Sequence, residues 1–233
     1  MDDETIGSSI LNPRLLAGTE HEVSSRRIAL KRVADATRVL IENLVGTDLD
    51  EATINATAER LEALAGTFDR DAPGSTYDGV WESAMAGGEP DATFDHSPMI
   101  GRANPLAPPI TLELFENLVV GRVNFGSAYE GPPGCVHGGY VACAFDEILG
   151  AAQTFSGAPG MTGTLTIRYR KPTPLHQDLR FEGRFDRKEG RKVFTTGQVF
   201  AGDLLTAEAE GIFVSIPATR FTELREERDR RMR

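Results

Sequence analysis

The feature that most constrains the fold is a run of small and apolar residues from Tyr140 to Ala152. Two acidic residues, Asp146 and Glu147, are its only charged side chains. A helix that is apolar on nearly every face must be buried on nearly every face. The rest of the domain is therefore expected to wrap around this segment.

Alternating apolar and polar residues predict six β-strands around this helix. Leu165 and Ile167 share one face of a strand, and Arg168 and Arg170 share the other. Short connections containing Gly predict hairpin turns at 188–190 and 201–203. The expected strands span residues 111–114, 119–125, 162–170, 179–185, 193–200 and 205–216.

An antiparallel sheet with one apolar face and one helix, between its second and third strands, is expected to curl around that helix. The sequence therefore predicts an α+β domain over residues 105–217. Residues 71–104, rich in Gly, Pro, Asp and Ser, are interpreted as a connecting segment. Residues 218–233 are interpreted as a charged C-terminal tail.

The N-terminal residues 1–70 are expected to form a helical extension. Apolar residues recur at spacings of three, four and seven between Arg27 and Leu44, which indicates an amphipathic helix. A second helix is expected after Thr47, because acidic residues occupy its first turn. The apolar stripe of this helical hairpin must be buried somewhere, and we expect it to cover apolar surface of the core or to help close a substrate channel.

Charge and composition exclude several classes of function. The net charge of -10 argues against binding to nucleic acid, which requires clustered basic residues. No apolar run reaches the roughly 18–20 residues of a membrane span. Cys135 and Cys143 suggest no disulfide framework, and no secretory leader is evident, so we expect a reduced, cytoplasmic protein.

The triplet His137-Gly138-Gly139 opens the helical run, and Asp146 follows nine positions after the histidine. Together with Thr162 and the run 169–175, Tyr-Arg-Lys-Pro-Thr-Pro-Leu, this pattern resembles the phenylacetyl-CoA (PaaI) type of hot-dog thioesterase. The resemblance covers about half of the chain. It implies a hot-dog fold, hydrolysis of acyl-coenzyme A without a cofactor or metal, and active sites at the interface of a homodimer or a dimer of dimers.

The resemblance assigns the catalytic carboxylate to Asp146, which acts either as a general base on water or as a nucleophile on the thioester. A carboxylate inside a buried helix costs several kcal/mol unless partners or a pKa shift compensate. The structural alternatives are exit to solvent and a core ion pair. Glu147 lies about 100° around the helix from Asp146, so the two are not expected to share one small site.

Backbone N–H groups of Gly138 and Gly139 at the helix start are suited to bind the thioester oxygen as it becomes an oxyanion. In the resembling enzymes the matching histidine lies beside the thioester. The resemblance therefore implies that His137 either orients the loop or transfers a proton. The resemblance gives Thr162 the role of positioning water or Asp146. Alternation of side chains along the strand places Thr162 on the polar face. Thr162 therefore reaches the site only if the strand begins irregularly or its hydroxyl turns inward.

One helix cannot supply both halves of such a site, because Gly138 and Asp146 are about 12 Å apart along its axis. Two antiparallel helices in a two-fold dimer would bring Gly138 of one chain near Asp146 of the other. The family often has Asn in the loop before the triplet, where this chain has Glu130-Gly131-Pro132-Pro133. A second oxyanion donor is therefore not evident.

Basic residues cluster at 168–171 and 180–192, and Arg170 and Lys171 are the candidates for binding a coenzyme A phosphate. Solvated strand faces are the alternative for most of these residues. Two other functions fit the same fold. One is hydration or dehydration of an acyl thioester, with His137 and Asp146 as the acid-base pair. The other is an acyl-CoA-binding protein without turnover.

Overall fold

The structure is a computed structural model that describes residues 25–68, 94–158 and 160–216, with five further residues near the C-terminus. Six strands form one antiparallel sheet in the order β1-β2-β4-β5-β6-β3. The strands are β1 (Thr111–Phe115), β2 (Leu118–Asn124), β3 (Gly160–Tyr169), β4 (Asp178–Glu189), β5 (Lys192–Ala201) and β6 (Leu204–Ser215). Most of the expected connecting segment and tail lies outside the described residues, so the predicted domain boundaries stay predictions.

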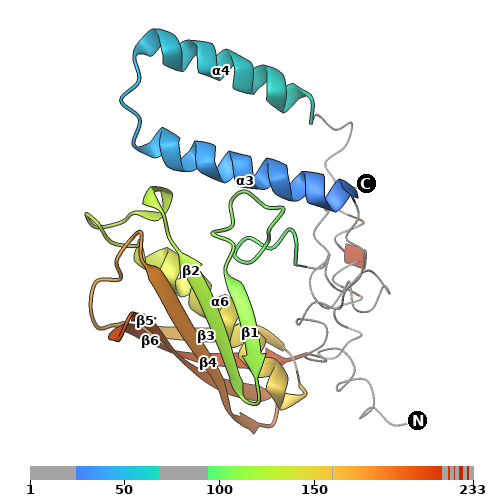
Figure 1. Ribbon diagram of the computed structural model, residues 1–233. Helices are drawn as coiled ribbons and strands as arrows, with labels where there is room; N and C mark the ends of the chain where they lie inside the picture. The colour runs from blue at the N-terminus through green and yellow to red at the C-terminus, as the bar shows by residue number, and fades with distance from the viewer. Residues whose placement is uncertain are drawn as a thin grey trace.

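Helix α6 (Gly138–Ala152) lies in the curve of the sheet and is followed by the short helix η3 (Gln153–Ser156) (Figure 1). Its side chains Phe145, Ile148 and Leu149 are completely buried. They pack in one core cluster with strand residues such as Phe181 and Phe213. The sheet wrapped around a central helix confirms the predicted hot-dog fold.

Glycines on four strands let the helix lie close to the sheet. A Cβ at Gly121 of β2 would stand 2.2 Å from the Ile148 side chain, and one at Gly183 of β4 would stand 2.7 Å from it. A Cβ at Gly197 of β5 or Gly211 of β6 would crowd the Leu149 side chain at 3.0 and 3.3 Å. Larger residues at these positions would lift α6 off the sheet, because close-packed interiors leave little room for added atoms.

One stripe of α6 is open, contrary to the expectation of burial on nearly every face. Gly139, Cys143 and Asp146 are exposed, and Gly150 is half-buried. The sheet covers the opposite side of the helix, and β1 and β3 are the sheet's two edges. These four residues recur at spacings of four, three and four, so they form a single line along the helix.

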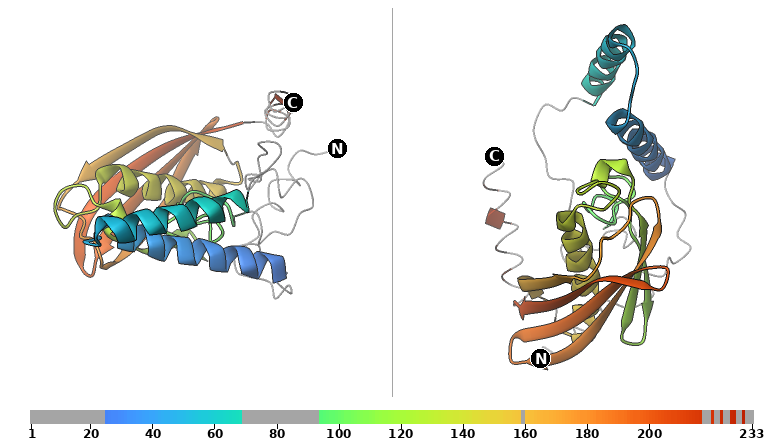
Figure 2. Two further views of the ribbon diagram at one scale, coloured as in Figure 1. Left: turned by 90° about the horizontal axis from the view of Figure 1, so that it is seen from above. Right: turned by 90° about the vertical axis from the view of Figure 1, so that its left-hand side faces the viewer.

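The N-terminal helices are α3 (Ser25–Val45) and α4 (Glu51–Gly66), and they confirm the predicted helical hairpin. Helix α3 lies along the loops that flank the β1–β2 hairpin, and α4 lies farther out (Figures 1 and 2). Asp50 caps α4, because its carboxylate accepts from the Thr53 N–H at 3.0 Å. Within the described residues, no helix is both long and apolar enough to span a bilayer.

Helix α3 docks through polar groups as well as through its apolar stripe, on which Ala34 is buried and Leu30 and Ile41 are half-buried. The Arg38 guanidinium donates to four backbone carbonyls at 2.8–3.0 Å, those of Gly101, Arg102, Asn104 and Ala107. The Glu42 carboxylate accepts from the Ser127 N–H at 2.9 Å, at the start of the short helix η2 (Ser127–Tyr129). Apolar side chains of the hairpin such as Val39 and Leu64 remain exposed, at 61% and 54%.

Candidate active site

The N-terminus of α6 is shaped by His137, which is the N-cap of the helix. The ring Nδ1 of His137 accepts from the Gly139 N–H at 3.0 Å. The backbone N–H of His137 donates to the Tyr129 carbonyl at 2.8 Å. A ring nitrogen that accepts a hydrogen bond cannot carry a proton, so Nδ1 is the bare nitrogen in this arrangement. The histidine caps the helix start, and its role in catalysis stays a prediction.

The two glycines after His137 differ in their backbone hydrogen bonds. The N–H of Gly139 donates to the His137 ring, so the expectation that it is available to a thioester oxygen is wrong. The N–H of Gly138 has no acceptor in the described part of the chain. The Gly138 carbonyl accepts from the Tyr169 hydroxyl at 2.7 Å. Gly138 is thus the position where an oxyanion could find a backbone donor.

A groove of about 580 Å³ opens beside this helix start. It is formed by the loop before α6, the first turn of α6, and the end of β3 with the residues that follow it. The candidate residues Gly138, Gly139, Arg170 and Lys171 all line it. The remainder of the lining is largely apolar and includes Pro132, Cys135, Val136, Val141 and Pro172. The groove therefore combines a largely apolar lining with two basic residues, Arg170 and Lys171.

Asp146 is held by a residue from β3. The Thr162 hydroxyl donates to Asp146 Oδ1 at 2.7 Å. The pairing of β3 with β6 shifts between Thr162 and Thr164, which leaves Gly163 as an extra residue. Thr162 consequently stands opposite the buried Phe213 and shares its face of the sheet. The irregular strand start required for this contact is present.

The two carboxylates of α6 differ in burial, and the expected burial of Asp146 is not observed. Asp146 lies on the open stripe and is exposed, whereas Glu147 is half-buried. Burial, followed by repulsion from the Asp146 charge, raises the pKa of Glu147 to about 7. The desolvation argument made for Asp146 therefore applies to Glu147. Their directions also differ as expected from the 100° step, because only Asp146 contacts Thr162.

The basic candidates are largely engaged on the outer sheet face. Arg170 lines the groove, but its guanidinium pairs with Glu208 at 2.6 Å. The hydrogen bond from Arg170, together with the charge of its guanidinium, lowers the pKa of Glu208. Arg180 and Arg184 both pair with Glu182. Lys171 forms no ion pair within the described residues, so it is the basic side chain at the groove that lacks an acidic neighbour.

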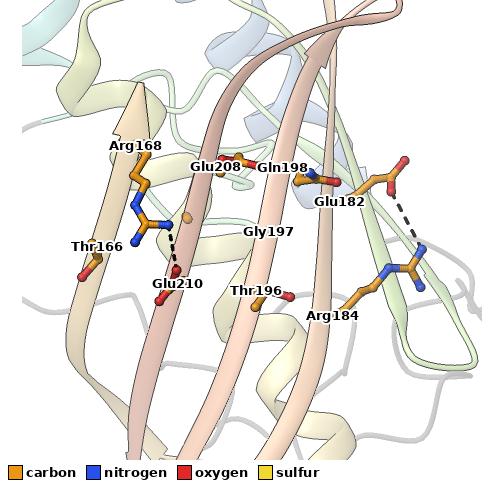
Figure 3. Close-up of a pocket in the computed structure, with 10 residues that line it drawn as sticks. Thr166, Arg168, Glu182, Arg184, Thr196, Gly197, Gln198, Glu208 and Glu210 are labelled. Atoms are coloured by element: carbon orange, nitrogen blue, oxygen red, sulfur yellow. Dashed lines mark hydrogen bonds and ion pairs between the residues drawn. The ribbon is translucent and has the colours of Figure 1, made fainter. Parts of the chain in front are cut away.

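A second hollow of about 350 Å³ lies on the sheet face opposite α6 (Figure 3). It is lined by charged side chains that are already paired, such as Arg168 with Glu210 at 3.2 Å and Arg184 with Glu182 at 3.9 Å. It contains neither the helix start nor Asp146. The basic residues of this face therefore fit the alternative to coenzyme A binding, in which they belong to a solvated strand face.

Glu130 does not take the role of the asparagine that the resembling enzymes often have in the loop before α6. Its carboxylate accepts from the Gly134 N–H at 2.6 Å and so closes the loop before α6. An ionised carboxylate can only accept hydrogen bonds, so it cannot stabilise an oxyanion. Among the described residues, no cluster of His, Cys, Asp and Glu has the composition of a metal site.

Comparison with solved structures places this geometry in a family. The crystal structure of RHA08564, a thioesterase superfamily protein, is 37% identical in sequence, with a TM-score of 0.68. The match covers 79% of this chain and 94% of that one. The chain belongs to the thioesterase superfamily. The matched share is larger than the sheet and α6 alone, so the likeness includes part of the N-terminal half.

Sequence comparisons place the family pattern in the same region. The model of the thioesterase superfamily matches residues 133–208 of this superfamily member. The acyl-coenzyme A thioesterase THEM4 of Xenopus laevis is 37% identical over 93 residues, and that of Bos taurus is 34% identical over 93 residues. These stretches are 39% of this chain and 42% and 38% of the two relatives. The chain thus spans less than half the length of the curated relatives it matches.

Tyr169 is the residue at the site whose contact sequence reasoning missed. The sequence shows it as part of the run 169–175, and its spacing of two from Ile167 puts both side chains on the same face of β3. The contact with Gly138 joins residues 31 positions apart. Strand alternation gives the face of a side chain but not its partner, so this hydrogen bond required the structure.

Proposed function

We propose that this thioesterase superfamily protein hydrolyses the thioester of a fatty or aromatic acyl-coenzyme A to the free acid and coenzyme A. The observation that carries the proposal is the hydrogen bond of 2.7 Å between Thr162 and Asp146, on the open stripe of α6. It orients one carboxylate oxygen and leaves the other accessible. The matched relatives named acyl-coenzyme A thioesterase support the choice of substrate.

In this mechanism Asp146 acts in one of two ways. As a general base it accepts a proton from water while the water oxygen attacks the thioester carbon. As a nucleophile it attacks that carbon and forms an anhydride, which water then hydrolyses. In both routes the carbonyl oxygen becomes an oxyanion that accepts from the Gly138 N–H, and coenzyme A leaves as the thiolate.

The site is shared between two chains in this proposal. Gly138 and Asp146 are eight residues apart, about 12 Å along the axis of α6, which exceeds the reach of one thioester carbon and its oxygen. The open stripe of α6 offers a surface for a two-fold contact with the same stripe of a second copy. Among the described residues, strand β3 pairs with β6 alone, so its other edge can extend the sheet across that contact.

Hydration of an acyl thioester is less compatible with the site. A histidine that acts as a general base needs a bare ring nitrogen facing the substrate. The bare nitrogen of His137 is Nδ1, which already accepts from the Gly139 N–H. An acyl-CoA-binding protein without turnover would have no need for a carboxylate oriented by Thr162.

The first test compares Asp146→Asn with Glu147→Gln, which lies one position further along the same helix. Asp146→Asn keeps the shape but removes the charge. Hydrolysis of a medium-chain or aromatic acyl-CoA should fall by at least ~100-fold with the substrate still bound. Glu147→Gln should retain most of the activity, because its side chain leaves the helix in another direction. Similar losses in both variants would exclude the assignment to Asp146.

The second test asks whether each site draws on two chains. Gly138→Pro removes the backbone donor. The backbone of a first helical position accepts proline, and the added Cβ, 3.2 Å from the Tyr169 hydroxyl oxygen, requires only that the end of this exposed side chain shifts. Homodimers of Asp146→Asn or of Gly138→Pro would both be inactive. A mixed dimer would keep one intact site, with Asp146 and Gly138 from opposite chains, so an equal mixture should recover about a quarter of wild-type activity. Folded mixed dimers without recovery would contradict a shared site.

A further inference from the structure

The peptide between Gly138 and Gly139 is held from both sides. Its N–H donates to His137 Nδ1 at 3.0 Å, and its carbonyl accepts from the Tyr169 hydroxyl at 2.7 Å. One holding side chain comes from the loop before α6 and the other from the end of β3. A peptide plane fixed at both ends cannot rotate without losing one of the two hydrogen bonds.

The two glycines provide the space for these side chains. A Cβ at Gly138 would stand 3.2 Å from the Tyr169 hydroxyl oxygen, and a Cβ at Gly139 would stand 3.1 Å from His137 Nδ1. Both separations are tighter than ordinary van der Waals contact. Each glycine therefore leaves space for one of the two residues that hold the peptide.

We propose that Tyr169 is a positioning residue that orients the Gly138 N–H toward the thioester oxygen, an inference that rests on the proposed thioester hydrolysis. Tyr169 acts on the peptide that follows this N–H and fixes the backbone of Gly138 before substrate binds. Preorganised donors of this kind stabilise developing charge without a cost of reorganisation at the moment of reaction. The hydroxyl contacts the enzyme backbone and not the substrate.

Strand β3 then supplies two of the positioning contacts. Thr162 near its start holds Asp146, and Tyr169 at its end holds Gly138. Because the site is shared, the carboxylate and the donor that meet at one thioester belong to different copies of β3 and α6. A single strand consequently orients halves of two active sites.

The test is Tyr169→Phe, which removes only the hydroxyl. We expect kcat to fall about 5- to 10-fold, the effect of one neutral hydrogen bond, with KM unchanged. The matched control is Tyr140→Phe, because the Tyr140 hydroxyl makes no hydrogen bond in the described part of the chain and its ring packs on Tyr129 at 4.8 Å. The control should keep wild-type kcat and KM.

Two coenzyme A analogues separate positioning from a general structural effect. An alkyl-CoA thioether has no carbonyl oxygen, so it should inhibit wild type and Tyr169→Phe equally. A trifluoromethyl ketone analogue forms a tetrahedral adduct, so its affinity for Tyr169→Phe should weaken by the same factor as kcat. Equal weakening of both analogues, or a loss of thermal stability that accounts for the lost activity, would overturn the role of Tyr169.

The wild-type protein separates this proposal from the proposed function. If wild type hydrolyses acyl-CoA and Tyr169→Phe does so at the same rate, the positioning role is wrong and the thioesterase function stands. If wild type hydrolyses no fatty or aromatic acyl-CoA, the function itself fails, and the positioning role fails with it.

Discussion

Replacement of Glu147 by glutamine should stabilise the protein at alkaline pH but not at acidic pH. Burial, together with the adjacent Asp146 charge, raises the pKa of Glu147 from 4.5 to about 7. The native state therefore binds this proton more tightly than the unfolded chain. Between these two pKa values the unfolded state carries fewer protons, so the free energy of unfolding must fall as pH rises.

The size of the effect follows from the shift in pKa. One pKa unit corresponds to 1.36 kcal/mol, so the shift of Glu147 corresponds to an upper limit of about 3 kcal/mol lost between pH 4 and pH 8. Glutamine keeps the shape but has no charge, so the variant avoids this loss. For a protein of this size the gain at pH 8 corresponds to a melting temperature higher by about 5–10 °C.

The assay is thermal unfolding of wild type and Glu147→Gln at pH 5, 6, 7 and 8, with the exposed Glu59→Gln as a matched control. The difference in melting temperature between Glu147→Gln and wild type should be small at pH 5 and should grow through pH 7. The control should show no such growth. A Glu147→Gln variant that is less stable than wild type at pH 8 would show that the carboxylate is ionised and favourably paired, and the reasoning would be refuted.

Two further predictions address the other polar contacts. Thr162→Val should lower kcat about tenfold through loss of its hydrogen bond to Asp146, and Thr164→Val, on the opposite face of β3, should not; equal kinetics of the two variants would contradict this. Arg38→Ala should lower the free energy of unfolding by about 2–4 kcal/mol in urea titrations, because four carbonyls lose their donor. The exposed Arg32→Ala should change it little, and similar losses in both would argue against the docking role.

The sheet, the central helix and the helical hairpin could be predicted from sequence because their signals are local. Alternation along each strand and the apolar run at 140–152 report which faces must avoid water. The triplet at 137–139 and the spacing to Asp146 likewise indicated where the candidate site lies. The contact of Thr162 with Asp146 was expected only if β3 began irregularly.

The remaining features depend on pairing between distant segments. The extra residue Gly163 is a property of the register between β3 and β6, which no pattern within β3 specifies. The open stripe through Asp146 depends on where the sheet ends. The apolar composition of 140–152 alone therefore overestimated the burial of α6. The cap formed by His137 and the contact of Tyr169 with Gly138 likewise join groups whose proximity arises only in the folded chain.

The attachment of α3 through carbonyl groups has a consequence for how this region can diverge. Arg38 recognises the course of the backbone over 101–107 and not the identity of the side chains there. Substitutions in that loop are therefore tolerated as long as its path is kept, with the exception of Gly101, where a Cβ would meet backbone atoms at 2.3–2.8 Å. Insertions or deletions would move the carbonyls away from Arg38. Homologues are thus expected to preserve the loop's length while its composition drifts.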